Sequence, residues 1–304
     1  MLKALGRRSC EDAGIPFRST LALKVLESGQ DEAIRRDDLQ LRVSSLQMRS
    51  AAVWEPRVGT AVSFPDGAQA ARQTGLARPW TDHLKNWRNH AGGALNRAGL
   101  EEREFTVLSN DCWGQALYEG YGLPLQTPLA GSGMYADCFI RFLSDIEGYL
   151  RSPLRFVRNT RHVALGRVRN QRWPWPIAVL REDVEVHFLH HRSEDACRRV
   201  WEAGCEKLQL KRIAVKFSVD KDGATEEHVR RFAAMPFERK LLISRNHHPG
   251  IACAVEIPNY VANGAVMFRR SIKHFDCTHW LNTGEILRTS PRIWMNKAIY
   301  ARGV

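Results

Sequence analysis

Residues 105–118 read FTVLSNDCWGQALY, and this stretch decides the fold that we predict for the chain. The first four residues predict a buried strand, and a polar turn, SNDC, follows at 109–112. A helix is predicted to begin at Trp113 or Gly114. A strand that enters a helix through a tight turn places backbone N–H groups and short side chains at the carboxyl edge of a sheet, where open α/β folds bind ligands. We therefore expect a functional site at this turn.

Strands and helices are predicted to alternate downstream of residue 183. The predicted strands are 184–189, 213–217 and 240–244, and the predicted helices are 193–207 and 225–234. This alternation is typical of parallel βαβ units, so the predicted fold class is α/β, a layered, mostly parallel sheet with flanking helices, Rossmann-like. Because parallel strands share a direction, His190, His191, Ser218 and Ser244 should lie on the same sheet edge as the 109–112 turn.

The two ends of the chain differ in their sequence pattern. Residues 1–80 show no sustained periodicity and are predicted to be a poorly ordered or loosely attached extension, whereas residues 81–304 are predicted to form one α/β domain. Within that domain an N-capped helix is expected from Thr81 or Asp82, and an amphipathic helix over 135–150. Residues 158–180 are interpreted as a basic connector interrupted by prolines.

Composition restricts the class of protein and its surroundings. The 304 residues carry a formal net charge of +12, which favours acidic partners or indicates a solvated basic surface. No nucleic-acid-binding motif accompanies the charge, so no nucleic acid partner is expected. The seven cysteines are scattered and form no C-x-x-C pair, which argues against a disulfide framework and a structural zinc site. With no apolar signal region or membrane-length apolar run, we expect a cytoplasmic protein, with peripheral membrane contact left open.

Cys112 is the leading candidate nucleophile. At a helix N-terminus, the backbone dipole would lower the pKa of its thiol. The alternative is a small hydrophobic side chain packed beneath Trp113. Ser109 and Asp111 are further candidates for the same role, although Ser109 can instead bond the turn and Asp111 can simply cap the helix.

Three histidines near the end of one predicted strand are candidate bases. Strand alternation places His187 on one face and His190 on the other, and His190 or His191 at the strand end could reach the 109–112 turn. The alternative is a structural role for these side chains. Because the strand scatters the rings over both faces, a three-histidine metal site is disfavoured and no metal is predicted.

Cofactor-binding candidates surround the same sheet edge. The turn residues Asn110, Asp111, Trp113 and Gly114 are expected to contact a cofactor. Lys216, Lys240 and Arg245 are candidate phosphate ligands, though each alone is an ordinary surface cation. The sequence contains no G-x-G-x-x-G, P-loop, G-x-S-x-G or H-E-x-x-H motif, which argues against nicotinamide dehydrogenases, P-loop NTPases, standard esterases and zincins.

Four segments together resemble a bacterial family of unknown function whose members are often labelled exopolysaccharide or capsule biosynthesis proteins. The segments are LSNDCWG at 108–114, DVEVHFLHHRSEDACRRVWEAGCEKL at 183–208, VKFSVDKDGATEEHVRRFAAMPFERK at 215–240 and FDCTHWLN at 275–282. The likeness covers residues 105–282. The turn usual in the family resembles Ser-Asn-Asn-Cys-Trp-Gly, so Asp111 replaces a more common asparagine, whereas Ser109, Asn110 and Cys112 stay in register.

This resemblance implies an α/β fold and a role in assembling surface polysaccharide. The turn is also similar to the Asn-Cys turn of another capsule-biosynthesis group thought to bind coenzyme A. The favoured hypothesis is a cytoplasmic acyltransferase that uses acyl-coenzyme A and acts on a polysaccharide precursor, with Asn110 and turn N–H groups stabilising an oxyanion. One alternative is a transferase for a nucleotide-activated donor with metal ligands at Asp220 and Asp222. Another is a non-catalytic assembly component that makes contacts through its basic surface and residues 173–176.

Overall fold

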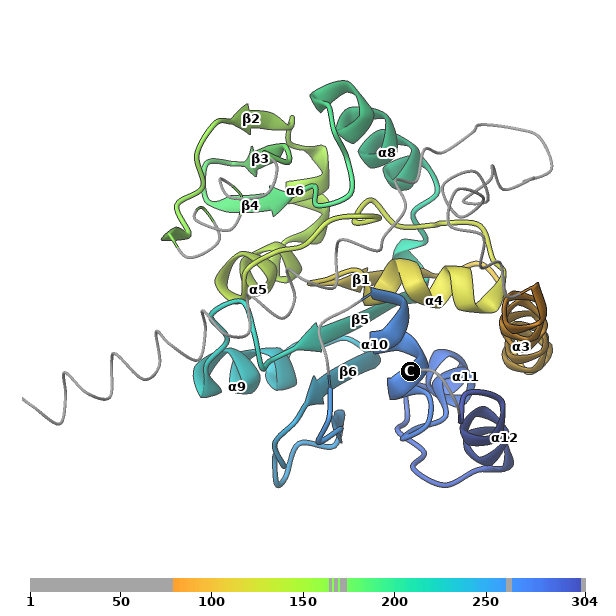
Figure 1. Ribbon diagram of the computed structural model, residues 1–304. Coiled ribbons are helices and arrows are strands. Elements are labelled where there is room, and N and C mark those ends of the chain that lie inside the picture. The colour runs from red at the N-terminus through yellow and green to blue at the C-terminus, as the bar shows by residue number, and fades with distance from the viewer. Residues whose placement is uncertain (1–78, 164–165, 167–168, 170–173, 261–263, 302–304) are drawn as a thin grey trace, which may run out of the picture. The chain divides into compact units, whose positions relative to one another are not determined.

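The structure is a computed structural model that describes residues 79–163, 166, 169, 174–260 and 264–301 (Figure 1). The strands are β1 (Thr106–Ser109), β2 (Arg155–Val157), β3 (Ile177–Leu180), β4 (Val184–His187), β5 (Ile213–Ser218), β6 (Arg239–Ser244) and β7 (Ala254–Glu256). The helices are α3 (Pro79–Ala98), α4 (Trp113–Tyr121), α5 (Ala136–Ser144), α6 (Ile146–Arg151), α8 (Glu194–Glu206), α9 (Glu226–Ala234), α10 (Gly264–Ser271), α11 (Cys277–Thr283) and α12 (Pro291–Ile299). Apart from its last two residues, which begin α3, the predicted extension lies outside the described residues.

A four-stranded parallel sheet, in the order β1-β5-β6-β7, confirms the predicted α/β fold class. Residues of its central strands are buried on both faces, as the nearly continuous apolar runs of parallel strands require. One core lies between the sheet and α4, α10 and α11, where Trp113 packs edge-on against Phe268 and Trp280. The other core lies between the opposite face, α5, α9 and the second sheet, and includes Phe139 and Phe217.

The second sheet corrects the predicted topology. The strand expected at 184–189 as part of the parallel sheet is β4, which instead pairs antiparallel with β3 in the order β2-β3-β4. The connection from β3 to β4 is too short to cross over a sheet. Arg181 and Glu182 both have positive φ, 46° and 68°, and reverse the chain as a tight hairpin does. The supposed connector at 158–180 therefore contains strand β3.

The amphipathic helix predicted over 135–150 is two helices, α5 and α6. Asp145 separates them with φ −151° and ψ 65°, and its carboxylate accepts a hydrogen bond from the Gly148 N–H at 3.0 Å. An aspartate that bonds nearby backbone competes with the continuing helix and favours a new N-cap. The expected helices at 193–207 and 225–234 are confirmed as α8 and α9.

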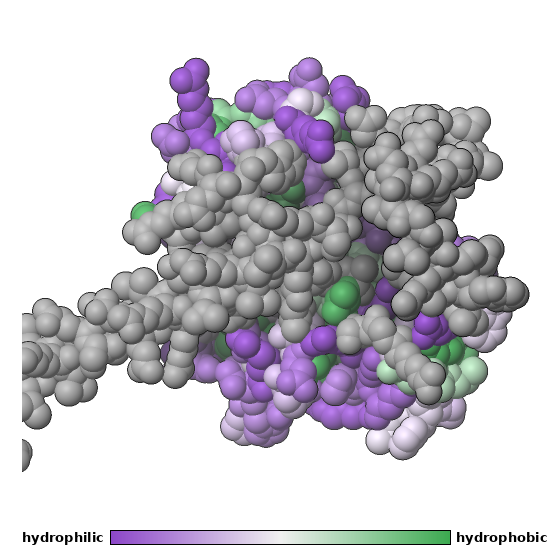
Figure 2. All heavy atoms as spheres, in the orientation of Figure 1, coloured by the Kyte–Doolittle hydropathy of each residue, from purple (hydrophilic) through white to green (hydrophobic). Residues whose placement is uncertain are grey.

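The exposed surface of the described elements is mostly hydrophilic on the face in view (Figure 2). Among the described residues, no helix combines the length and the apolar character that crossing a bilayer requires. Six cysteines of the described part of the chain are free thiols.

Helix α8 packs against the chain at Thr127 and Pro128, directly before the loop at residues 129–134. Gly204 faces that loop so closely that a β-carbon built on it would lie 2.5 Å from Pro128 Cα and 2.5 Å from the Thr127 carbonyl oxygen. Both obstacles are backbone atoms, which cannot rotate away as a side chain can. The absence of a side chain at residue 204 is therefore what lets α8 and the loop approach.

We predict that Gly204→Ala destabilises the protein by about 1–3 kcal/mol, the usual cost of overpacking. In an unobstructed helix the same change would stabilise by about 1 kcal/mol, so the sign is diagnostic. Urea denaturation measures the free energy of unfolding. The exposed neighbour Ala203→Ser should change it by less than about 0.5 kcal/mol, and a Gly204→Ala variant that is more stable would contradict this packing.

Candidate active site

The turn after β1 is anchored to the end of β5 by Asn110. The Asn110 Oδ1 accepts a hydrogen bond from the Ser218 N–H at 2.9 Å, and Nδ2 donates to the Ser218 carbonyl at 3.1 Å. The Asn110 side chain is completely buried. Both ends of its amide are therefore engaged by backbone and anchor the turn, while the roles predicted for Asn110 toward an oxyanion or a cofactor stay predictions.

Asp111 is a buried carboxylate with five polar contacts. Lys216 Nζ donates to both of its oxygens at 2.8 Å, and Lys221 Nζ lies 3.3 Å from Oδ2. The Ser109 hydroxyl and the Trp113 N–H each donate to Oδ1 at 3.0 Å. Burial by itself would raise the pKa of Asp111, but the two ammonium groups hold that pKa far below its usual range. The predicted helix-capping contact of Asp111 is present, as part of this larger network.

Lys216 is fully buried, which corrects the prediction that it binds a cofactor phosphate at the sheet edge. Its Nζ also donates to Ser218 Oγ at 2.5 Å and lies over the rings of Trp113 and Tyr260, 5.7 and 5.8 Å from their centres. Burial lowers the pKa of Lys216 to about 8, although the charge of Asp111 opposes the change. The side chain is an internal counterion for Asp111.

Cys112 and His190 meet at the mouth of this network. The Cys112 Sγ lies 3.2 Å from His190 Nε2 and 4.0 Å from the Ser132 carbonyl oxygen. Both side chains are half-buried. His190 follows β4 of the antiparallel sheet, so the predicted juxtaposition occurs, but between two sheets and not along one edge.

The thiol and the imidazole are both neutral at pH 7. Burial and the charge of Asp111 raise the pKa of Cys112 to about 12. Burial, followed by the neighbouring His191, lowers the pKa of His190. The predicted lowering of the thiol pKa by the helix dipole is therefore wrong, because desolvation and an adjacent carboxylate outweigh the N-terminus of α4.

A glycine-containing loop, residues 129–134, shapes the space around the thiol. Gly131 has φ +66°, and its carbonyl accepts a hydrogen bond from the His190 N–H at 3.1 Å. A β-carbon on Gly131 would lie 2.7 Å from His191 Nε2. His191 is buried, and its Nε2 lies 3.1 Å from the Ala130 carbonyl oxygen, so it supports the loop rather than the thiol.

Several predicted site residues are structural. Ser109 is buried and its hydroxyl donates a hydrogen bond to Asp111, so it is not placed as a nucleophile. Trp113 is buried with its Nε1–H donating to Ser271 Oγ at 2.9 Å, and Gly114 is buried beside it. The indole contact corrects the expectation that the Trp113 side chain binds a cofactor, whereas Gly114 can offer a ligand only its backbone.

His187 lies in β4 with 1% of its surface exposed. Its Nδ1 is 3.4 Å from the indole Nε1 of Trp175, and its Nε2 is 3.3 Å from Glu185 Oε2. These partners belong to the second sheet and its surroundings, so His187 is not the histidine that faces the thiol. The histidines 187, 190 and 191 have separate partners, as strand alternation predicted.

The two carboxylates of the D-x-D sequence have different partners. Asp220 accepts hydrogen bonds from the Arg245 N–H at 2.6 Å and from Ser244 Oγ at 3.2 Å, which ties the ends of β5 and β6 together. Asp222 has φ 56° and pairs with Lys221 at 3.1 Å. This geometry does not favour a shared metal for a nucleotide-activated donor.

The candidate phosphate ligands beyond β5 lie at different ends of the sheet. Arg245 directly follows β6 at the carboxyl edge, as predicted. Lys240 is at the beginning of β6, and its Nζ donates to the carbonyls of Ala233 and Met235. Lys221, which sequence reasoning did not select, is the cation beside Asp111; its signal was its place between two aspartates after β5.

We predict that Asp111→Asn destabilises the protein by about 3–5 kcal/mol, because it leaves the buried Lys216 ammonium without its counterion. Adding Lys216→Met should recover much of the loss, since an apolar side chain needs no partner. Asp222→Asn, which removes the partly exposed pair with Lys221, should cost less than about 1 kcal/mol. Urea denaturation of the variants checks this, and an unchanged Asp111→Asn protein would contradict the role of the pair.

The raised pKa of Cys112 predicts a distinctive alkylation profile. The thiolate fraction should rise about tenfold per pH unit from pH 7 to 10 without a plateau. Iodoacetamide labelling, quantified for the peptide that contains Cys112, measures the rate. The same peptide in urea-unfolded protein should level off above about pH 8.5. A plateau below pH 7 in the folded protein would instead indicate a thiolate–imidazolium pair.

Two comparisons place the chain among known proteins. The model of a domain of unknown function, DUF1919, matches residues 84–282, which include Cys112 and His190. An uncharacterized protein of Haemophilus influenzae is 24% identical over 192 residues, or 60% of this chain and 86% of the relative. Neither description mentions polysaccharide or capsule, so that association stays a prediction. The resemblance to a family of unknown function is confirmed, and the chain belongs to the DUF1919 family.

Proposed function

We propose that this protein is a cysteine-dependent acyltransferase in which Cys112 is the nucleophile and His190 the general base. The 3.2 Å separation of Cys112 Sγ and His190 Nε2 carries the proposal, because it places an acid–base partner within reach of a thiol at the start of a helix. Both groups are partly exposed, as a reaction with an external donor requires.

Because Cys112 and His190 are both neutral at rest, the thiol must lose its proton to His190 during its attack on the donor. As Sγ attacks the acyl carbon, its proton passes to His190 Nε2, and the leaving group of the donor takes that proton as its bond to the acyl group breaks. The acceptor hydroxyl then gives its proton to His190 and attacks the thioester. As the bond between carbon and sulfur breaks, His190 returns that proton to Sγ and the free thiol is restored. A lowered pKa keeps His190 unprotonated near pH 7 and ready to accept the proton.

The surroundings of the thiol support charge stabilisation in the first step. Backbone N–H groups in the first turn of a helix have no intrahelical acceptor and can stabilise the negative charge of a tetrahedral intermediate. In α4 the first of them, the Trp113 N–H, is used by Asp111. The amides that follow, at Gly114 and Gln115, are the donors that we assign to the oxyanion.

We propose acyl-coenzyme A as the donor and a surface-polysaccharide precursor as the acceptor, in the cytoplasm. The acceptor is inferred from the resemblance to polysaccharide biosynthesis proteins, and the compartment from the lack of an apolar signal region in the sequence. Support for an anionic donor comes from Lys221, a partly exposed side chain whose Nζ lies 3.3 Å from Asp111. Its charge lowers the pKa of Cys112, against the larger opposing effects of burial and Asp111. Arg245 lies at the same sheet edge and is a second candidate for phosphate contact.

Incubation with acetyl-coenzyme A should produce an acetyl adduct on Cys112, detected by intact-mass and peptide mass spectrometry. Cys112→Ala should form none, and His190→Gln should acylate about 100-fold or more slowly, the usual loss when a general base is removed. The matched control is Cys253→Ser, a half-buried thiol next to β7 that should leave the rate unchanged.

The donor and the nucleophile are tested separately. A small acyl thioester that labels Cys112 while acetyl-coenzyme A does not would reject coenzyme A but keep the nucleophile. Absence of an adduct with either donor, or equal labelling of the Cys112→Ala variant, would reject acyl transfer through this thiol and favour the non-catalytic alternative.

A further inference from the structure

A second group of chemically active side chains lies away from Cys112, where the residues after β2 pass β4. One ligand-type atom from each of His162, Glu185 and His187 lies within 4.8 Å of the other two. The Nε2 atoms of His187 and His162 are 3.3 and 3.9 Å from Glu185 Oε2. The side chains of Glu185 and His187 are almost completely buried, and that of His162 is 13% exposed.

The spacing of these atoms suits a small tetrahedral cation. Zinc binds histidine nitrogen and carboxylate oxygen at about 2.0–2.2 Å, which sets neighbouring ligand atoms about 3.3–3.6 Å apart. Glu185 Oε2 lies 3.3 and 3.9 Å from the two histidine nitrogens, so the His162 side must contract slightly, and the nitrogens lie within 4.8 Å of each other. Two imidazoles and one carboxylate are also a ligand set that zinc-class ions accept.

One nitrogen of this group faces a carboxylate but forms no well-aligned hydrogen bond with it. Within the described residues, His187 Nε2 is buried and makes no hydrogen bond of acceptable geometry, although Glu185 Oε2 is 3.3 Å away. Buried polar atoms without partners are rare in folded proteins and call for a ligand or another explanation. Because this nitrogen faces the carboxylate, a cation between them would satisfy both.

The surrounding contacts hold the ligands in place. Glu185 Oε2 accepts a hydrogen bond from Thr160 Oγ1 at 2.6 Å, and Oε1 accepts one from the Arg161 N–H at 2.9 Å. The His162 ring stacks on Tyr135 at a centroid distance of 3.7 Å. Supporting contacts of this kind orient metal ligands and strengthen binding.

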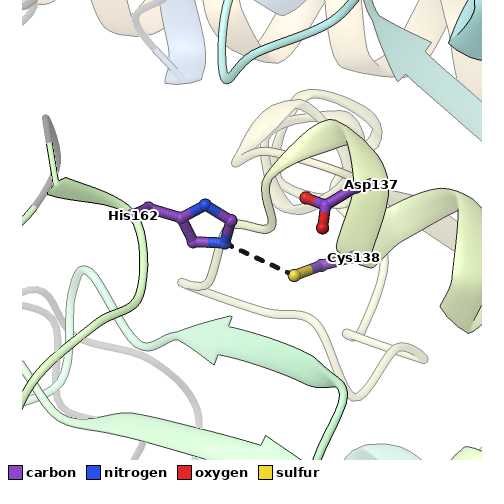
Figure 3. A group of neighbouring side chains, drawn as sticks. All are labelled: Asp137, Cys138 and His162. Carbon is purple, nitrogen blue, oxygen red and sulfur yellow. Dashed lines mark hydrogen bonds between the residues drawn. The ribbon is translucent and has the colours of Figure 1, made fainter.

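We propose that His162, Glu185 and His187 bind a divalent cation of the zinc class. Figure 3 shows the neighbouring contacts of His162, whose ring faces Cys138 at 3.5 Å with Asp137 close by. Cys138 is already engaged by Arg161 Nη2 at 2.9 Å, so we assign it a neighbouring position and not a ligand role. The protein supplies three ligands, and solvent completes the coordination.

Proton positions give the proposal a spectroscopic consequence. A neutral imidazole carries one proton, so binding a metal through His187 Nε2 places that proton on Nδ1. Nδ1 can then no longer accept from the indole N–H of Trp175, which lies 3.4 Å away. The metal should therefore change the fluorescence of Trp175, and the change should be lost in Trp175→Phe.

The experiment uses the full chain, treated with a chelator, dialysed and titrated with ZnCl₂ against a chromophoric zinc indicator. The expected result is one bound zinc per chain, a raised Tm and altered tryptophan fluorescence. His162→Gln and Glu185→Gln should each weaken binding more than about 100-fold, beyond the about 10–100-fold cost of losing a supporting contact.

The control is His247→Gln, which alters an exposed histidine 3.4 Å from Glu256 and should bind zinc as the unmodified chain does. His162 is the most exposed ligand, so its variant should fold, which circular dichroism verifies. The proposal is overturned if the unmodified chain binds no zinc at micromolar concentration. It is also overturned if the folded His162→Gln protein binds zinc with unchanged affinity, or if only His247→Gln loses binding.

Discussion

The buried ion pair between Asp111 and Lys216 is the constraint on which the site depends. Charges removed from water are tolerated only with partners and hydrogen bonds, and here two lysines, a hydroxyl and a backbone N–H surround one carboxylate. The pair fixes the turn after β1 against β5. Burial is the main cause of the raised pKa that keeps the Cys112 thiol protonated, and the negative charge of Asp111 adds to it. The pair thus shapes the turn, and its carboxylate contributes to the chemical state of the sulfur.

The thiol and its base come from two different sheets. Cys112 follows a strand of the parallel sheet, whereas His190 follows a strand of the antiparallel sheet. The loop at 129–134 contacts both, since its Gly131 carbonyl accepts from the His190 N–H and its Ser132 carbonyl lies 4.0 Å from Sγ. The distance between sulfur and imidazole therefore depends on how the second sheet packs against the first, with α8 holding the intervening loop. The candidate metal ligands belong to the same second sheet and its flanking residues, so the two sites share a structural support.

The sequence predicted the parallel sheet, because the apolar runs around β1, β5 and β6 end in polar turns. It predicted that His190 could reach the Cys112 turn by placing 184–189 in that sheet, whereas β4 belongs to the antiparallel one. It did not predict β3, since the run at 177–180 follows two prolines and the Arg-Glu-Asp connection lacks the glycine or asparagine of common hairpins. Burial could not be foreseen either. Lysine and asparagine are residue types that usually lie on the surface, and only the packed structure shows that Lys216 and Asn110 are buried. The approach of His162 to Glu185 and His187 joins residues too distant in sequence for spacing rules to detect.

The protonated state of Cys112 has a consequence for survival under oxidative conditions. Peroxides attack the thiolate, and sulfenic acid forms slowly where the sulfur keeps its proton. A nucleophile that becomes an anion only while a donor is bound would be spared by oxidants that inactivate low-pKa cysteine enzymes. Burial, reinforced by the carboxylate of Asp111, raises the pKa of Cys112 and would thus protect the resting protein from oxidation.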